Sequence, residues 1–174
     1  MRYVLCSLLV LFATGLAAGA ESPPQKLKSV MLQDVQGLTG GQSVYITEEG
    51  AAWVQIVRTP KAHEIGLQEE RFKADLAAAE RDELAKLLAK NGFWNQTSSV
   101  RPGVPDEARP TITAVTDLNT HSVARWANDR TKEFDAVYEA LKTVAKKTAA
   151  SKPVFAGKYD PSWKPAVAAD KPSK

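Results

Sequence analysis

The stretch DLAAAERDELAKLLAKNGFW, residues 75–94, decides how the rest of the chain is interpreted, because its pattern is that of an amphipathic helix. The apolar side of this helix is formed by Leu76, Leu84, Leu87 and Leu88. Asp75 is the expected N-cap, and Asn91-Gly92 predicts the end of the helix, with Gly92 in the left-handed conformation at C′. Phe93 then follows as C″ and is expected to fold back onto Leu88. The stretch predicts a core helix, not a site.

Short β-rich runs and a second helix flank this first helix. Residues 43–47 and 52–58 alternate around a turn at 48–50, and residues 111–116 and 121–126 alternate around a turn at 117–119, so each pair predicts a hairpin. Residues 132–148 carry apolar side chains at helical spacing, with N-cap candidates at 128–131 and lysines in the last turn. The order is therefore hairpin, helix, hairpin, helix.

Residues 61–74 allow two interpretations. Ile65, Phe72 and Leu76 are spaced so that the first helix would extend backwards by several turns, but Gly66 would then lie inside it. Phe72, Ala74 and Leu76 also fit a period of two. We favour a loop followed by a third short strand over 71–74.

These elements predict an α+β fold, a two-layer antiparallel sheet of four to five strands with two helices on one face. Residues 1–20 are assigned to a signal peptide and residues 21–41 to an N-terminal linker that contributes at most a short edge strand. A single α+β domain is expected over 42–149. Residues 150–174, rich in Pro, Lys and Ala, are expected to be a disordered tail.

The first twenty residues predict export, to a periplasm or to the outside of the cell. A positive start (Met1-Arg2), an apolar run over 3–16 and small residues at 18–20 form a secretory signal. A lipoprotein signal would need a cysteine at the cleavage point, and Cys6, the single cysteine, lies far upstream of it. Cleavage removes Cys6, so no disulfide is expected, which favours a bacterial protein. No later apolar run has membrane-spanning length.

Charge and motifs exclude several function classes. Without Arg2 the chain has 22 basic and 20 acidic residues, a balance that does not favour nucleic acid as a partner. Known catalytic, phosphate-binding and metal-binding patterns are missing, so we expect no enzyme activity, no cofactor and no metal. The enzyme alternative is a small hydrolase or metal-dependent enzyme using His63, His121 and Asp106. Two histidines are fewer ligands than zinc sites usually have.

Two regions carry candidate binding residues. In the loop over 96–109 these are Arg101, Pro102, Pro105, Asp106 and Arg109. Prolines stiffen such a loop and lower the entropy lost on docking, although a plain connecting loop is the simpler interpretation. In the tail they are Phe155, Tyr159 and Trp163. These aromatic residues suggest a docking motif for a partner. Alternatively, the tail folds back onto its own domain.

Four short patterns together resemble the emfourin-like family of small secreted bacterial domains, which inhibit thermolysin-type metalloproteases. The patterns are Gly40-Gly41 before a strand, Gly92-Phe93-Trp94 ending a helix, Pro105-Asp106 before TITAV, and His121-Ser122-Val123 before the last helix. The resemblance covers about residues 40–144 and implies inhibition of a peptidase, but it transfers no inhibitory residue. The sequence thus predicts an exported, non-enzymatic protein-binding domain, with a secreted or periplasmic peptidase as partner. The alternative of another class is an envelope-associated structural protein tethered by its tail.

Overall fold

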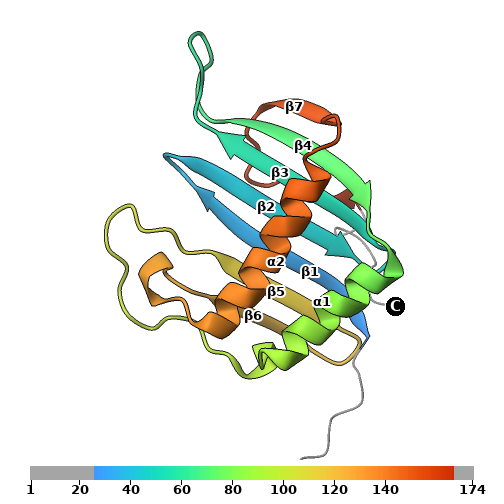
Figure 1. Ribbon diagram of the computed structural model, residues 1–174. Helices are drawn as coiled ribbons and strands as arrows, with labels where there is room; N and C mark the ends of the chain where they lie inside the picture. The colour runs from blue at the N-terminus through green and yellow to red at the C-terminus, as the bar shows by residue number, and fades with distance from the viewer. Residues whose placement is uncertain (1–25, 167–174) are drawn as a thin grey trace, which may run out of the picture.

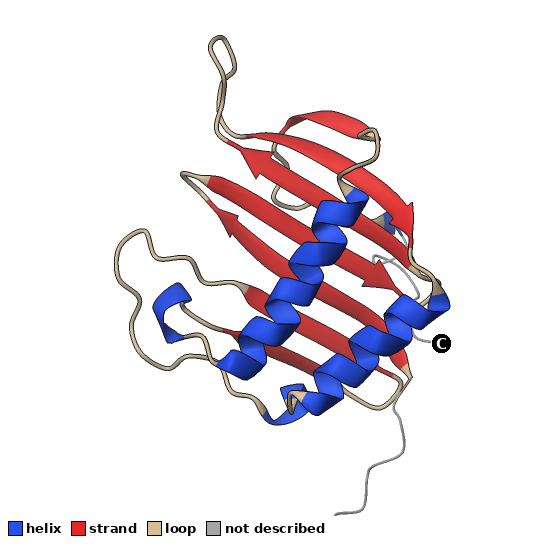
Figure 2. Ribbon diagram, in the orientation of Figure 1, coloured by secondary structure: helices blue, strands red, loops and turns tan. Residues whose placement is uncertain are grey.

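A computed structural model describes residues 26–166 as one antiparallel sheet with two helices on one of its faces (Figures 1 and 2). The strands are β1 Leu27–Gln36, β2 Gly40–Thr47, β3 Ala51–Arg58, β4 Gln68–Asp75, β5 Thr111–Thr116, β6 Thr120–Ala124 and β7 Phe155–Lys158. The helices are α1 Ala78–Lys90 and α2 Lys132–Thr148, with short 3-10 turns η1 Phe93–Asn95 and η2 Ala127–Asp129. The strand order across the sheet is β6-β5-β1-β2-β3-β4-β7. The expected signal peptide lies outside the described residues.

Alternation along the strands places the core between the sheet and the helices. One row of paired residues runs across the sheet from Leu32 through Val44 and Val54 to Phe72, and all four are buried. The helices add Leu84, Leu88, Phe134 and Leu141 to the same cluster. Residues one position away on each strand face the opposite side of the sheet, which we call the bare face because neither α1 nor α2 covers it.

The start of α1 differs from the sequence prediction. Asp75 is the last residue of β4, and Ala77 is the N-cap, with the Glu80 carboxylate accepting a hydrogen bond from the Ala77 amide at 3.0 Å. The strand expected over 71–74 is present but begins earlier, at Gln68, so the backward helical extension is wrong. Gly92 has a φ of 58°, the left-handed conformation predicted for it, and Phe93 is fully buried.

The predicted fold class of four to five strands is wrong, because the sheet has seven. The expected linker over 21–41 contains β1, a ten-residue interior strand that pairs with β5 on one side and β2 on the other. Its pattern was ambiguous because only Val30 and Leu32 enter the core, whereas Asp34, on the same face, accepts a hydrogen bond from Tyr138. Because β1 is hydrogen-bonded to a strand on each side, it is stable in the sheet without a long apolar run of its own.

The predicted disordered tail over 150–174 is also wrong for its described part. Residues 155–158 form β7, which pairs antiparallel with β4, and residues 159–166 pass behind the sheet on the bare face (Figure 1). Composition does not predict this, because the segment is held by backbone pairing and by the packing of Trp163 against Tyr45 and Trp53, without an apolar run. Residues 167–174 lie outside the described part of the chain. Within residues 26–166, neither helix is long and apolar enough to cross a membrane.

Candidate recognition site at the loop end of the sheet

Three loops emerge at the same end of the sheet (Figure 1). β1 and β3 end there and β2 and β4 begin there, as the pairs Gln36–Gly40 and Arg58–Gln68 show. β5 also begins there, because Thr111 pairs with Gln33. The loops over 37–39, 59–67 and 96–110 therefore form one surface, which we call the loop end.

Large apolar side chains are exposed on all three loops. They are Leu38 at 76 % exposure, Ile65 at 86 %, Val100 at 99 % and Val104 at 56 %. Leu118, at 74 %, lies in the turn between β5 and β6 at the opposite end of the sheet. Scattered apolar residues on a surface need no explanation, but several gathered at one end indicate an interaction surface.

The loop between β3 and β4 contains an ion pair that closes residues 59–63. Arg58 Nη1 and Nη2 lie 2.6 and 2.8 Å from the two carboxylate oxygens of Glu64, a bidentate arrangement. The same carboxylate accepts a hydrogen bond from the Lys61 amide at 2.6 Å, and the Glu64 amide donates to the Lys61 carbonyl at 3.1 Å. His63, just before Glu64, has a φ of 74° and reverses the chain.

The loop over 96–110 contains the same arrangement. Arg101 Nη1 and Nη2 lie 3.0 and 2.5 Å from the carboxylate oxygens of Glu107. The Val104 amide approaches that carboxylate at 3.4 Å, and the Glu107 amide donates to the Val104 carbonyl at 3.2 Å. Asp106, just before Glu107, has a φ of 61°. The Asn128 amide adds a further donor at 3.0 Å.

We call each of these units an Arg–Glu clamp. In both, an arginine precedes the glutamate by six residues, a left-handed residue comes just before the glutamate, and the carboxylate receives the amide three residues earlier. The arginine lowers the pKa of the carboxyl group to about 2 in Glu64 and in Glu107. Each clamp closes the turn between its arginine and its glutamate, and the apolar residues of the two loops stay exposed.

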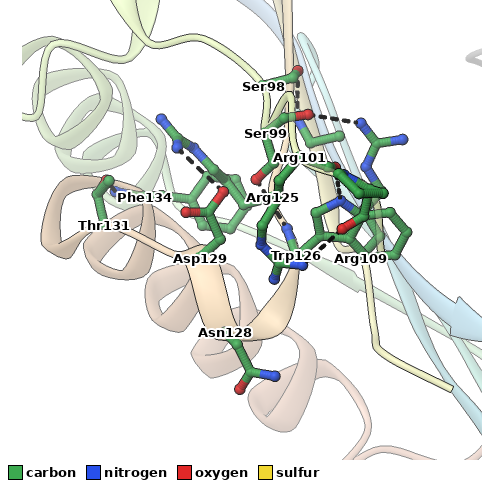
Figure 3. Close-up of polar contacts among 12 residues, drawn as sticks. Ser98, Ser99, Arg101, Arg109, Arg125, Trp126, Asn128, Asp129, Thr131 and Phe134 are labelled. Carbon is green, nitrogen blue, oxygen red and sulfur yellow. Dashed lines mark hydrogen bonds and ion pairs between the residues drawn. The ribbon is translucent and has the colours of Figure 1, made fainter. Parts of the chain in front are cut away.

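The second loop is also anchored on Trp126 (Figure 3). The indole Nε1 donates to the Arg101 carbonyl at 3.0 Å, and the Arg109 guanidinium lies 5.0 Å from the centre of the same ring. A Cβ atom added to Gly103 would lie 2.3 Å from a ring carbon, so the chain passes close against the indole. Ser99 donates its amide to the Ala124 carbonyl at 2.8 Å, which ties the loop to β6.

The residues predicted from sequence fall into two separate groups. Arg101 and Arg109 brace the loop from within, and the exposed Pro102, Pro105 and Asp106 form its outer turn. The tail residues Phe155 and Tyr159 lie beside the edge formed by β4, and Trp163 lies on the bare face against Tyr45 and Trp53. The structure does not bring the two groups together.

The residues of the enzyme alternative are also apart. His63 lies in the loop after β3, and His121 lies on β6, where its Nε2 is 2.9 Å from the Gln96 carbonyl oxygen and its ring packs against Phe93. β3 and β6 are four strand positions apart, about 19 Å at a spacing of about 4.8 Å. No group of three metal-ligating side chains occurs within residues 26–166.

Sequence reasoning missed the partners that make the loops rigid, namely Arg58, Glu64 and Glu107. A repeated Arg-x5-Glu spacing, with a proline shortly after the arginine, is visible in the sequence at 58–64 and 101–107. The spacing becomes informative only with the left-handed residue before the glutamate, which no local pattern at His63 predicts. At Asp106 the Pro-Asp pair is a turn signal.

Comparisons of this chain with protein-family models, curated proteins and solved structures give no match. The resemblance to emfourin-like domains therefore stays a prediction, and the functional argument rests on the geometry of the loop end.

Proposed function

We propose that this chain is an exported protein-binding domain that uses the loop end to bind and inhibit a secreted or periplasmic peptidase. The observation that carries the proposal is the pair of Arg–Glu clamps. Each clamp closes the turn between its arginine and its glutamate, while Ile65 on one loop and Val100 and Val104 on the other remain exposed.

Rigid loops with exposed apolar tips suit recognition for a physical reason. A flexible loop loses conformational entropy when it docks, and that loss subtracts from the free energy of binding. In both loops the clamp has already ordered the backbone in the free protein. Burial of the apolar tips in a pocket of the partner then contributes to affinity with little further ordering.

The dimensions of the loop end agree with an ordinary interface. The turn between β1 and β2 lies about two strand spacings, or about 10 Å, from the loop between β3 and β4 and from the β5–β6 side. The three loops therefore span about 20 Å. A standard protein interface covers about 800 Å² on each partner, a patch about 30 Å across.

Export and the class of partner rest on the sequence. The signal pattern over 1–20 supports a partner outside the cytoplasm, and the resemblance to emfourin-like domains supports a peptidase. The tethering alternative receives no support from the tail, because Trp163 packs against Tyr45 and Trp53 of the chain's own sheet.

The test replaces exposed apolar tips with charges. Ile65→Asp and Val100→Asp leave the core untouched, and Leu118→Asp is the matched control at the opposite end of the sheet. The variants would be compared in affinity capture from the exported fraction of the source organism and in inhibition of the captured peptidase. We expect at least about thirtyfold weaker binding for the two tip variants, typical of a hot-spot loss of 2 kcal/mol, and unchanged binding for the control.

A second arm tests the clamps themselves. Glu64→Gln and Glu107→Gln remove the charge that pairs with arginine, and Glu83→Gln removes an exposed ion pair with Lys86 on α1 as the control. Binding should weaken in the two clamp variants, and their loops should be cleaved faster by proteases. If the tip variants bind as the wild type does, or if only Leu118→Asp loses binding, the loop end is not the recognition surface.

A further inference from the structure

The C-terminal segment, residues 154–166, is bound to the sheet in the manner of a peptide ligand. Its strand β7 extends the edge of β4, with Phe155 paired to Arg71 and Lys158 to Gln68. Beyond the paired residues, the Val154 amide donates to the Arg71 carbonyl at 2.7 Å and the Tyr159 amide donates to the Leu67 carbonyl at 2.9 Å. Addition of a strand to an exposed edge is a common mode of peptide recognition.

Past β7, the side chain of Trp163 packs against the rings of Tyr45 and Trp53 on the bare face. Its ring centre lies 5.7 Å from that of Tyr45 and 6.1 Å from that of Trp53, both in edge-on geometry. The Arg71 guanidinium lies 4.5 Å from the Trp163 ring and 4.2 Å from the Phe155 ring, so one cation contacts two of the three aromatic residues of the segment.

Polar groups of the sheet bind the backbone of the same segment. Gln55 Nε2 donates to the Asp160 carbonyl at 3.2 Å, and the Asp160 amide donates to a carboxylate oxygen of Glu69 at 3.3 Å. Gln55 and Glu69 are buried on the bare face, and Glu69 is further paired with Gln55 and Arg71. Burying a carboxylate is costly unless donors surround it, and the segment supplies one of them.

The segment also forms a turn of its own just before Trp163. The Asp160 carboxylate accepts hydrogen bonds from the Ser162 amide at 2.9 Å and the Ser162 hydroxyl at 2.6 Å. The Trp163 amide donates to the Asp160 carbonyl at 3.3 Å. This turn projects the indole of Trp163 from a short peptide that is ordered locally.

The rest of the domain closes its core without this segment. Among the described residues, the hydrophobic cluster between sheet and helices includes none beyond Ala149. Most side chains of the segment are exposed, including Val154 and, in part, Phe155. The link from α2 to the segment is short, residues 149–153. The segment therefore has the features of a ligand that can leave its site while the core stays folded.

We propose that the edge of β4 and the bare face of β2–β4 form a peptide-binding site whose ligand is the C-terminal segment of a second copy of this chain. Two copies that exchange segments make every contact described above, and only the link over 149–153 changes conformation. Exchange of identical elements in this way is a recognised route to dimers. This inference is independent of the loop end.

Concentration decides which form is populated. A segment tied to its own site by a short link has an effective concentration in the millimolar range, so dilute protein is monomeric. The exchanged dimer forms at high protein concentration, or when concentrated protein is warmed until the segment releases and is then cooled slowly.

The test uses two single-cysteine variants of the full chain, both with Cys6→Ser. Glu70 and Ala156 are register partners on β4 and β7, a separation that a disulfide can bridge. One variant carries Glu70→Cys and the other Ala156→Cys. When they are mixed at high concentration, annealed and oxidised, we expect a covalent heterodimer. Adding Trp163→Ala to the Ala156→Cys chain should lower its yield at least tenfold, whereas Lys164→Ala, an exposed neighbour, should change it less than twofold.

A control chain carries both Glu70→Cys and Ala156→Cys. Formation of the disulfide within its monomer shows that the two positions are close enough to be bridged. If that disulfide forms and the mixed single variants give no heterodimer, the segment does not exchange and the proposal is overturned. Light scattering of annealed wild-type protein is the second measurement. A mass of twice that of the monomer supports exchange, and a monomer alone at every concentration overturns it.

Discussion

Trp163→Ala should loosen the C-terminal segment, and the structure indicates by how much. The substitution removes edge-on pairs with Tyr45 and Trp53, each worth about 0.5–1.5 kcal/mol, and a cation–π contact with Arg71 worth about 0.5–2 kcal/mol. The expected loss in the free energy that holds the segment on the sheet is about 2–4 kcal/mol.

This loss of binding free energy should first increase how often β7 detaches from β4. Lys158 lies in β7, and trypsin can cleave after it only when β7 leaves β4. Where opening is fast compared with cleavage, the cleavage rate follows the population of the open form. A loss of 2 kcal/mol raises that population about thirtyfold, so cleavage at Lys158, followed by mass spectrometry, should accelerate at least that much.

Global stability should fall by less than the local loss. Once the segment is detached, further weakening of its contacts has no effect on the remaining core, so the drop in a urea unfolding experiment is limited by the docking free energy. Lys164→Gln is the control in the same segment. A change of less than threefold in cleavage at Lys158 would refute the reasoning. So would a large global loss with an unchanged cleavage rate, because Trp163 would then support the core.

Three further predictions concern ionisation and the backbone. The pKa of about 2 in Glu64 and Glu107 means that both clamps add stability above about pH 4.5 and lose it as the pH falls towards 2, which carboxyl carbon NMR titration of the two residues would show. Burial, together with the hydrogen bond to Asp34, raises the pKa of Tyr138 to about 12, so stability should fall between about pH 10 and pH 12, where the unfolded chain loses the phenolic proton first. Tyr138→Phe should remove that alkaline loss in urea unfolding curves measured at several pH values. Gly92→Ala should cost about 1–2 kcal/mol in urea unfolding, because φ is 58° there and a Cβ atom would contact nothing within 4 Å; a change below 0.3 kcal/mol would exclude backbone strain.

The elements that sequence reasoning predicted well are those whose own residues decide their structure. α2 occupies the predicted residues 132–148, and Thr131, among the N-cap candidates, accepts a hydrogen bond from the Phe134 amide. Its apolar stripe and its lysine-rich end are local properties. The two hairpins follow for the same reason, since alternation and a turn lie within a few residues of each other.

The missed strands depend on partners far away in the sequence. β1 contributes few core residues of its own, and its position is set by pairing with β2 and β5. Its partners in β5 lie up to about ninety positions away in the sequence. β7 consists of four residues, and its stability comes from the edge of β4 and from Trp163 on the bare face. A strand of this kind carries little signal in its own composition, so counting strands from the sequence gave too few.

The sequence predicts where one of the candidate loops lies, but not which side chains stabilise it. The sequence predicts a proline-rich binding loop over 96–109 with Arg101 and Arg109 as contact residues, whereas in the structure both side chains brace the loop. The partner loop over 59–67 was overlooked because its importance depends on the pairing of Arg58 with Glu64. Side-chain pairing within loops requires the backbone path, which sequence periodicity does not supply.

The two clamps differ physically from the ordinary ion pairs of this surface. Glu83 and Lys86 on α1 are both largely exposed and form a single contact, which contributes little to stability. The Glu107 side chain is only 2 % exposed, although it belongs to a loop, and it receives both arms of Arg101 and the Asn128 amide. A carboxylate that accepts hydrogen bonds from several donors stabilises one conformation of the loop backbone. The same arrangement recurs at 58–64, where the chain connects different strands, so two of the three loops of the loop end are braced in the same way.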